Sequence, residues 1–280
     1  MEKAIKRYFP IFVLPTMIAF TLGFIIPFVE GVYLSFCKFT TVNDAKFIGF
    51  ANYAKVFADE TFVHAFWYTA AFTVVSVILI NVLAFAVALL LTKGFKGTNI
   101  FRTVFFMPNL IGGIVLGYIW QLLLNGILMK FSRTLTYSST YGFWGLIILM
   151  CWQQIGYMMI IYIAGIQNIP GELIEAAEID GATKWQILKK VTIPMVMPSI
   201  TVCSFLTLTN SFMLFDQNLA LTNGEPSKMS EMLALNIFNT FYGRTGYEGV
   251  GQAKAVIFFI LVTVIALTQN YLTRRKEVQQ

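Results

Sequence analysis

The chain has 280 residues, of which 57% are hydrophobic, 16% are aromatic and only 12% are charged, and its formal net charge is +6. Its mean hydropathy is +0.70. Because roughly a quarter of the residues in a soluble domain are charged, this composition excludes an ordinary soluble domain and indicates an integral membrane protein.

Six segments are apolar over the roughly 20 residues that a helix needs to cross a bilayer core. They predict an all-α membrane protein with six transmembrane helices, forming a single transmembrane domain over residues 1–280, with spans near 11–29, 66–92, 104–124, 143–166, 196–220 and 255–272. Asp216 is the one charged residue inside these segments. An outer-membrane barrel would instead show alternating strands of about 10 residues, and none is present.

Breaks and connections can be predicted along the same sequence. We expect Glu30 to end the first span and the stretch 38–64 to be a surface-lying connection. Pro108 with Gly112 and Gly113 predicts a kink in the third span. The outer loop 222–252 is longer than a connection needs, and it holds the turn sequence Asn223-Gly-Glu-Pro226. It is therefore expected to be a folded hairpin.

The basic residues set the orientation of the spans, because short cytoplasmic segments are rich in Lys and Arg. With both termini in the cytoplasm, 12 of the 20 basic residues face inward: Lys3, Lys6, Arg7, Lys93, Lys96, Arg102, Lys184, Lys189, Lys190, Arg274, Arg275 and Lys276. This topology accounts for the net charge of +6, so the charge is no argument for a nucleic-acid partner.

The segment 167–195 is a polar, helix-forming insert between two apolar spans, and this topology places it in the cytoplasm. Pro170 suits the first turn of a helix, and Gly181 is a natural helix end. Thr183 can cap a second helix, and Ile193-Pro194 is expected to break it at the membrane. The first helix carries four acids, Glu172, Glu175, Glu178 and Asp180. A docking site for a partner and an ordinary interfacial loop are both compatible with this pattern.

The spacing inside the insert resembles a known signature. Glu175-Ala-Ala is followed after three residues by Gly181, and after nine more by Val191-Thr-Ile-Pro194. This is similar to the EAA signature of binding-protein-dependent ABC import permeases. The flanks Ala164-Gly-Ile-Gln-Asn-Ile-Pro170 and Leu221-Thr-Asn-Gly-Glu-Pro226 look like the carbohydrate-uptake branch. The nearest type is the first permease of maltose or glycerol-phosphate systems, although Glu225 stands where that branch usually has a glycine.

The resemblance implies the type I ABC importer transmembrane fold in a bacterial inner membrane and several partners. These are a second homologous permease, two copies of a cytoplasmic ABC ATPase, and an extracytoplasmic solute-binding protein that delivers a saccharide. It also implies that a coupling helix near 170–179 docks on the ATPase, with Glu175 facing an arginine and Gly181 making the turn. The coupling residues would be Glu172, Glu175, Ala176, Ala177, Asp180 and Gly181.

The chain contains no phosphate-binding G-x-x-x-x-G-K-[ST] sequence. ATP and Mg²⁺ are therefore expected on the partner ATPase, and this subunit is expected to have no cofactor and no catalytic residues. The three cysteines, Cys37, Cys151 and Cys203, lack metal-ligand spacing, and His64 is the only histidine. A metal site is accordingly not expected.

Sugars bind to amides, hydroxyls and aromatic faces, and the fourth and fifth spans offer these groups. The candidate pathway residues are Gln153, Gln154, Tyr157, Thr207, Asn210 and Ser211. Hydrogen bonding between helices is the alternative role for them, as it is for Asn81. Asp216 suits a rim or binding-protein contact as well as it suits a substrate contact. The alternative functions are import of glycerol phosphate or another small polar solute, or a self-sufficient channel or secondary transporter.

Overall fold

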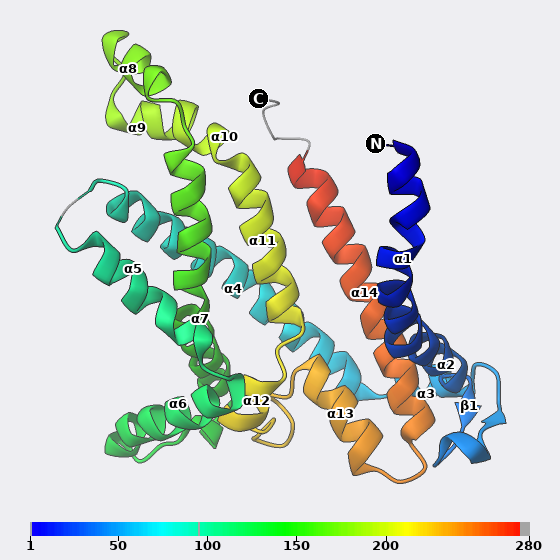
Figure 1. Cartoon of the computed structure of the whole chain (residues 1–280). Helices are drawn as coiled ribbons and strands as arrows, with labels where there is room; N and C mark the ends of the chain where they lie inside the picture. The colour runs from blue at the N-terminus through cyan, green and yellow to red at the C-terminus, as the bar shows by residue number, and fades with distance from the viewer. Residues whose placement is uncertain (1, 95, 275–280) are drawn as a thin grey trace. The chain divides into compact units, whose positions relative to one another are not determined.

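The computed structural model of the chain describes residues 2–94 and 96–274 (Figure 1). Arg275 and Lys276, which helped to assign the C-terminus to the cytoplasm, lie outside the described residues. The chain separates into two compact units. The first comprises Met1–Glu60 and Ile237–Ile260, and the second comprises Thr61–Asn236 and Leu261–Gln280.

The first unit begins with one long helical rod. It consists of α1 (Glu2–Phe20), a π-helical turn (Thr21–Ile25) and α2 (Ile26–Leu34). The expectation that Glu30 ends this span is wrong, because the helix continues to Leu34. Glu30 is exposed, and an exposed carboxylate near a helix end can reach water without disturbing the backbone.

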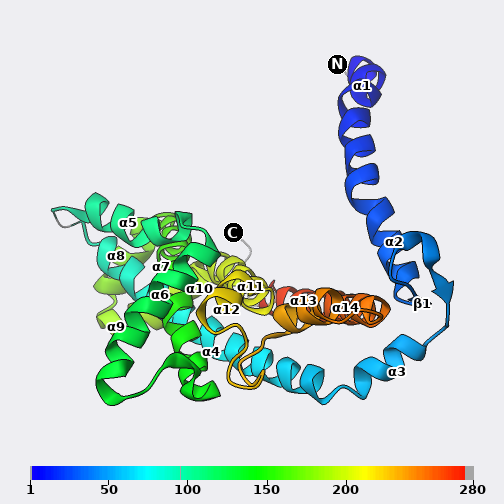
Figure 2. The same ribbon diagram turned by 90° about the horizontal axis from the view of Figure 1, so that it is seen from below.

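A small β-hairpin follows α2 in the first unit, at the end of the rod away from the N-terminus (Figures 1 and 2). Strands β1 (Cys37–Lys38) and β2 (Lys46–Phe47) pair antiparallel around a 3₁₀ turn at Val42–Asp44, and α3 (Ala51–Phe57) follows. The Asp44 carboxylate accepts the Thr40 and Thr41 N–H groups at 2.9 and 3.0 Å. These bonds close the turn and hold the pKa of Asp44 below its usual range.

A buried ion pair joins three segments of the first unit. Lys254 on α14 (Glu248–Arg274) is fully buried, and its Nζ lies 2.7 Å from Asp59 Oδ2. The same Nζ donates to Thr240 Oγ1 at 2.8 Å, on α13 (Leu233–Gly243). The last span therefore begins at Glu248 rather than near 255, and the loop expected at 222–252 contains α13. The sequence did not predict this start, because it shows the charge of Lys254 but not its neutralisation by Asp59.

The second unit holds the remaining helices. Their bounds are α4 (Glu60–Leu91), α5 (Thr98–Phe106), α6 (Gly113–Leu128), α7 (Ser139–Gln167), α8 (Gly171–Ile179), α9 (Lys184–Ile187), α10 (Ile193–Met195), α11 (Met197–Phe212) and α12 (Asp216–Leu221). Short 3₁₀ helices lie at Met107–Leu110, Met129–Phe131 and Leu135–Tyr137, and a π-helix at Leu188–Thr192. Within the described residues, five helices are long and apolar enough to cross a membrane, or six if the bent pair Lys184–Met195 and Met197–Phe212 forms one span.

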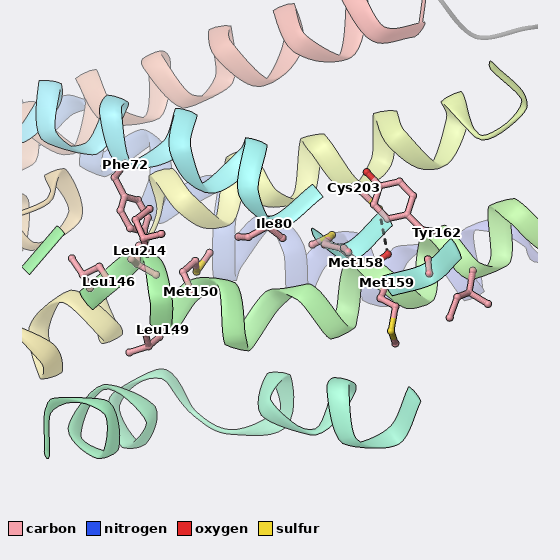
Figure 3. Close-up of a cluster of buried hydrophobic side chains, with 14 of the residues drawn as sticks. Phe72, Ile80, Leu146, Leu149, Met150, Met158, Met159, Tyr162, Cys203 and Leu214 are labelled. Carbon is pink, nitrogen blue, oxygen red and sulfur yellow. Dashed lines mark hydrogen bonds between the residues drawn. The ribbon is translucent and has the colours of Figure 1, made fainter. Parts of the chain in front are cut away.

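Helix α7 is the centre of the second unit. In its most apolar 18-residue window 61% of the residues are buried, against 28% for α4 and 11% for α6. Side chains from α4, α7 and α11 point toward one another in the core (Figure 3), including Phe72, Ile80, Leu146, Met150, Met158, Tyr162 and Cys203. Much of α7 therefore faces protein, so its polar residues are held in fixed positions.

Two of the expected spans are broken. The expected span 104–124 is divided into α5 and α6 by a non-helical step at Ile111–Gly112, so the kink predicted from Pro108, Gly112 and Gly113 is a complete break. The expected span 196–220 ends at Phe212, and α12 follows as a separate short helix. Hydropathy did not reveal either break, because the residues at both breaks are apolar.

The chain after α12 folds around one asparagine. Asn218 is fully buried; its Nδ2 donates to Ser230 O at 2.8 Å and its Oδ1 accepts the Met232 N–H at 2.9 Å. The turn predicted at Asn223-Gly-Glu-Pro226 is confirmed, with left-handed φ values of 49° at Asn223 and 80° at Gly224. The start of the outer loop is therefore an ordered part of the second unit.

Helices α5 and α7 are in backbone contact at Gly156. A Cβ atom at this position would lie 1.8 Å from Phe105 O. We expect Gly156→Ala to force the helices apart and to lower the free energy of unfolding by about 1–3 kcal/mol. Thermal unfolding of the detergent-solubilised protein measures this. Gly126→Ala on α6, where a Cβ meets nothing within 4 Å, is the control and should not lose stability. Equal midpoints for the two variants would contradict the contact.

Candidate functional site

Helices α8 and α9 form a polar helix–turn–helix that projects beyond the end of α7 (Figure 1). We call residues 171–187 the coupling module. Pro170 stands at the N-cap of α8, one position before the first turn. Gly181 makes the turn with a left-handed φ of +77°, a conformation that favours glycine. The Gly181 and Ala182 N–H groups donate to Glu178 O and Ala177 O, both at 3.0 Å.

A capping box begins the second helix of the coupling module. Gln186 N–H donates to Thr183 Oγ1 at 3.4 Å, and the Thr183 N–H donates to Gln186 Oε1 at 2.7 Å. The cap predicted at Thr183 is thus confirmed, and its reciprocal partner is Gln186. The break expected at Ile193-Pro194 is present, one residue later. The helix continues as a π-helix and α10 to Met195, and a 69° bend separates it from α11.

The coupling module presents acids and apolar side chains together. Glu172, Glu175, Ala176, Asp180 and Gly181 are exposed, whereas Ala177 is half-buried. Three large apolar side chains are also exposed, namely Leu173 at 43%, Ile179 at 86% and Trp185 at 69%. Such a mixture on a polar projection is typical of a protein-binding surface. Ile179 and Trp185 were not among the residues predicted for this surface, although their position among charged residues was a signal.

A polar cavity of about 340 Å³ lies in the second unit, between α7, α11 and α12. It is lined by Met150, Gln154, Asn210, Met213, Leu214, Phe215, Asp216 and Gln217. Asn210 Nδ2 donates to Gln154 Oε1 at 3.4 Å across it. The lining offers amides, one carboxylate and no cation. Its volume falls within the range of small-molecule sites, about 300–1,000 Å³.

Gln153 joins this cavity to the break between α5 and α6. Its Oε1 accepts a hydrogen bond from Gln217 Nε2 at 2.8 Å, and its Nε2 donates to Ile111 O at 3.4 Å. Glycines on α6 let α12 approach closely: a Cβ at Gly113 would lie 2.7 Å from Asp216 Cβ. Gln217 was not among the predicted site residues, because 196–220 was expected to be one continuous helix.

The predicted pathway residues therefore separate into groups. Gln154 and Asn210 line the cavity, and Gln153 lies directly behind it. Tyr157 is elsewhere, with its ring 6.4 Å from that of Phe106. Ser211 is fully buried, and its Oγ has no hydrogen-bond partner among the described residues.

Thr207 belongs to an interhelical network away from the cavity. Asn81 on α4 donates to Val77 O at 2.7 Å and to Thr207 Oγ1 at 3.3 Å, and it accepts from the Tyr162 hydroxyl at 2.7 Å. Thr207 Oγ1 donates to Cys203 O at 2.6 Å. These bonds tie α4, α7 and α11 together, which is the alternative role weighed for Thr207 and Asn81. In the described part of the chain, no group of three or more metal-ligating side chains occurs.

Sequence comparison relates most of the chain to known transport proteins. The model of the family described as "Binding-protein-dependent transport system inner membrane component" matches residues 80–278. A "Probable starch degradation products transport system permease protein", AmyD of Thermoanaerobacterium thermosulfurigenes, is 42% identical over 278 residues, which cover 96% of this chain and 94% of AmyD. The "Multiple sugar-binding transport system permease protein" MsmF of Streptococcus mutans is 28% identical over 289 residues, with 99% of each chain covered.

Solved structures of low sequence identity share the fold. A chain of a bacterial ABC transporter involved in the import of the acidic polysaccharide alginate superposes with a TM-score of 0.82 at 23% identity, covering 98% of both chains. A second structure, of a bacterial alginate ABC transporter with a pentasaccharide-bound periplasmic protein, gives 0.81 at 22% identity, covering 98% of this chain and 97% of that chain. The predicted all-α, type I ABC importer transmembrane fold is confirmed.

The Asn81 network and the cavity should respond differently to substitution. Asn81→Leu leaves the buried Tyr162 hydroxyl without its acceptor, so we expect a loss of about 1 kcal/mol in stability and a lower unfolding midpoint in detergent. Asn210→Leu, at an exposed position, removes only the 3.4 Å contact with Gln154 and should leave the midpoint nearly unchanged. If Asn210→Leu destabilised the protein as much as Asn81→Leu, the two polar groups would not have separate roles.

Proposed function

This chain belongs to the family of binding-protein-dependent transport system inner membrane components, and we propose that it is the permease subunit of an ATP-driven importer of a sugar or oligosaccharide. It is a multi-pass protein of the bacterial cytoplasmic membrane. The observation that carries the proposal is the coupling module, which presents exposed acids beside the apolar Leu173, Ile179 and Trp185. Exposed apolar side chains on a polar projection are a feature of protein-binding surfaces.

We propose that this partner is a cytoplasmic ATPase, which binds ATP and Mg²⁺ and hydrolyses the nucleotide. Glu175 would pair with an arginine of the ATPase in a charge-assisted contact, while Ala176 allows close approach and Gly181 fixes the turn. Glu172, Ala177 and Asp180 would complete the coupling surface, with Ala177 packed toward the bundle. Closure of two ATPase copies would then move the coupling modules of this chain and a second, homologous permease as rigid bodies.

The cavity between α7, α11 and α12 supports a neutral saccharide as the transported solute. Its amides from Gln154, Asn210 and Gln217 suit the hydroxyls of a sugar. The relatives AmyD and MsmF are named for starch degradation products and multiple sugars. An extracytoplasmic solute-binding protein would deliver the sugar, as the family description implies. The cavity is lined by the carboxylate of Asp216 and by no cationic side chain. It therefore offers no positive charge to the phosphate of glycerol phosphate, the alternative solute.

Within the pathway, we assign substrate contacts to Gln154 and Asn210 and a positioning role to Gln153. Tyr157, Thr207 and Ser211 do not line the cavity in this structure. They remain candidates for contacts in another conformation of the transport cycle.

Substitutions in the coupling module test the partner. Gly181→Val forces a β-branched residue into a left-handed φ of +77°, which should misdirect α9. Glu175→Gln removes the charge offered to the ATPase. We expect both variants to reduce co-purification of the ATPase and sugar uptake, while the permease remains in the membrane. Gly126→Ala is the control, because it lies on α6 outside the coupling module, a Cβ there meets nothing within 4 Å and φ is ordinary. Normal uptake by both test variants would refute the assignment.

Substitutions in the cavity test the solute pathway. Asn210→Ala and Gln154→Ala each remove hydrogen bonds worth about 0.5–1.5 kcal/mol, so uptake of radiolabelled maltodextrin at limiting concentration should fall about two- to tenfold. ATPase assembly should be unaffected.

Thr209→Val serves as the matched control for the cavity substitutions. The Thr209 hydroxyl bonds only to carbonyls of its own helix and does not line the cavity. An equal loss of uptake in Thr209→Val and Asn210→Ala would show that the effect is not specific to the cavity.

A further inference from the structure

A second cavity, of about 510 Å³, lies beneath the coupling module in the second unit. Its walls come from the end of α4, the end of α7, both helices of the module and the π-helix that follows. The apolar part of the wall is made of Leu89, Ile166, Ile169, Ile174, Ile187 and Leu188. The proposed transport of sugar uses none of these residues. A large apolar space of this kind suits a hydrocarbon chain.

Charged side chains stand at the rim of this cavity. Lys93 follows α4, Lys184 begins α9 and Glu178 lies on α8, and all three line the cavity and are exposed. Neither lysine forms an ion pair with an acid in residues 9–94 and 96–274. Two positive charges and one negative charge leave a net charge of +1, so the rim is open to a ligand with one negative charge.

The position of the cavity limits the kind of ligand. Helices α4 and α7 are candidate membrane spans that end at Leu91 and Gln167, and the cavity is formed by residues at and just beyond these ends. In the predicted topology these helix ends face the cytoplasm, so the cavity is expected near the headgroups of the cytoplasmic leaflet, with acyl chains on the apolar side. Basic pockets between transmembrane helices on the cytoplasmic side are known to bind anionic lipid headgroups.

We propose that this cavity is a binding site for an anionic phospholipid of the inner leaflet, of the phosphatidylglycerol type. The phosphate lies between Lys93 and Lys184, and one acyl chain lies against Ile166, Ile169 and Ile174. The headgroup hydroxyls donate to the Glu178 carboxylate. A zwitterionic lipid fits less well, because its net charge of zero leaves the extra positive charge of the rim unpaired.

A lipid in this position connects elements that are far apart in sequence. Lys93 belongs to the connection after α4, whereas Lys184 and Glu178 belong to the coupling module. One phosphate between the two lysines therefore braces the module against the end of a membrane span. Charge-assisted hydrogen bonds of this kind are about twice as strong as neutral ones, and the surrounding headgroup region is less polar than bulk water.

The test is native mass spectrometry of the assembled transporter, released into detergent from nanodiscs that contain equal amounts of phosphatidylglycerol and phosphatidylethanolamine. We expect a retained phosphatidylglycerol adduct on the wild-type protein. Lys93→Gln with Lys184→Gln should lose it. Lys189→Gln, which removes an exposed charge from the same segment but does not line the cavity, should keep it.

A second variant separates lipid binding from general loss of charge. Leu89→Trp fills the apolar part of the cavity and leaves every charge in place, so it should also lose the adduct while the subunits remain assembled. The proposal is overturned if phosphatidylethanolamine is retained as strongly as phosphatidylglycerol. It is equally overturned if the adduct survives in the double lysine variant or in Leu89→Trp. Sugar uptake is not part of this readout, so the result is independent of the transported solute.

Discussion

A carbonyl group that a broken helix releases within the membrane must find another hydrogen-bond donor, because lipid offers none. The break between α5 and α6 releases such a group at Ile111, and Gln153 donates to it from the most buried span. The same amide accepts from Gln217 on α12, which follows the second break. Gln153 thus forms hydrogen bonds at both helix breaks, and the cavity between α7, α11 and α12 depends on these bonds.

The cavity and the coupling module are built on the same two helices. Helix α7 carries Gln154 near its middle and leads at its end into α8, and the chain returns through α9 and α10 to α11, which carries Asn210. The module is therefore continuous in sequence with two walls of the cavity. Helix α5 packs closely against α7 through the backbone contact between Gly156 and Phe105. In the proposed function, this arrangement would link the ATPase to the solute site without a separate relay.

The sequence predicted the features that depend on local chemistry. The structure has the expected turn or cap at Gly181, at Thr183 and at Asn223–Pro226. Each of these features depends only on residues that are close in sequence. The sequence did not predict the end of the fifth span at Phe212 or the start of α14 before Lys254. Both depend on partners distant in sequence: Gln153 holds α12, and Asp59 neutralises Lys254. Gln154 and Asn210 were selected for their chemistry, whereas Gln217 required knowledge of the break.

The π-helix at Leu188–Thr192 fixes the rotational phase between the coupling module and α11. Each residue of an α-helix turns the chain by about 100°, and a π turn typically accommodates one residue more than an α turn. Deletion of a single residue between Ile187 and Val196 would rotate α8 relative to α11 by about 100° around the axis of the connecting helix. Substitutions leave that phase intact. The number of residues in this connector is therefore more tightly constrained than their identity.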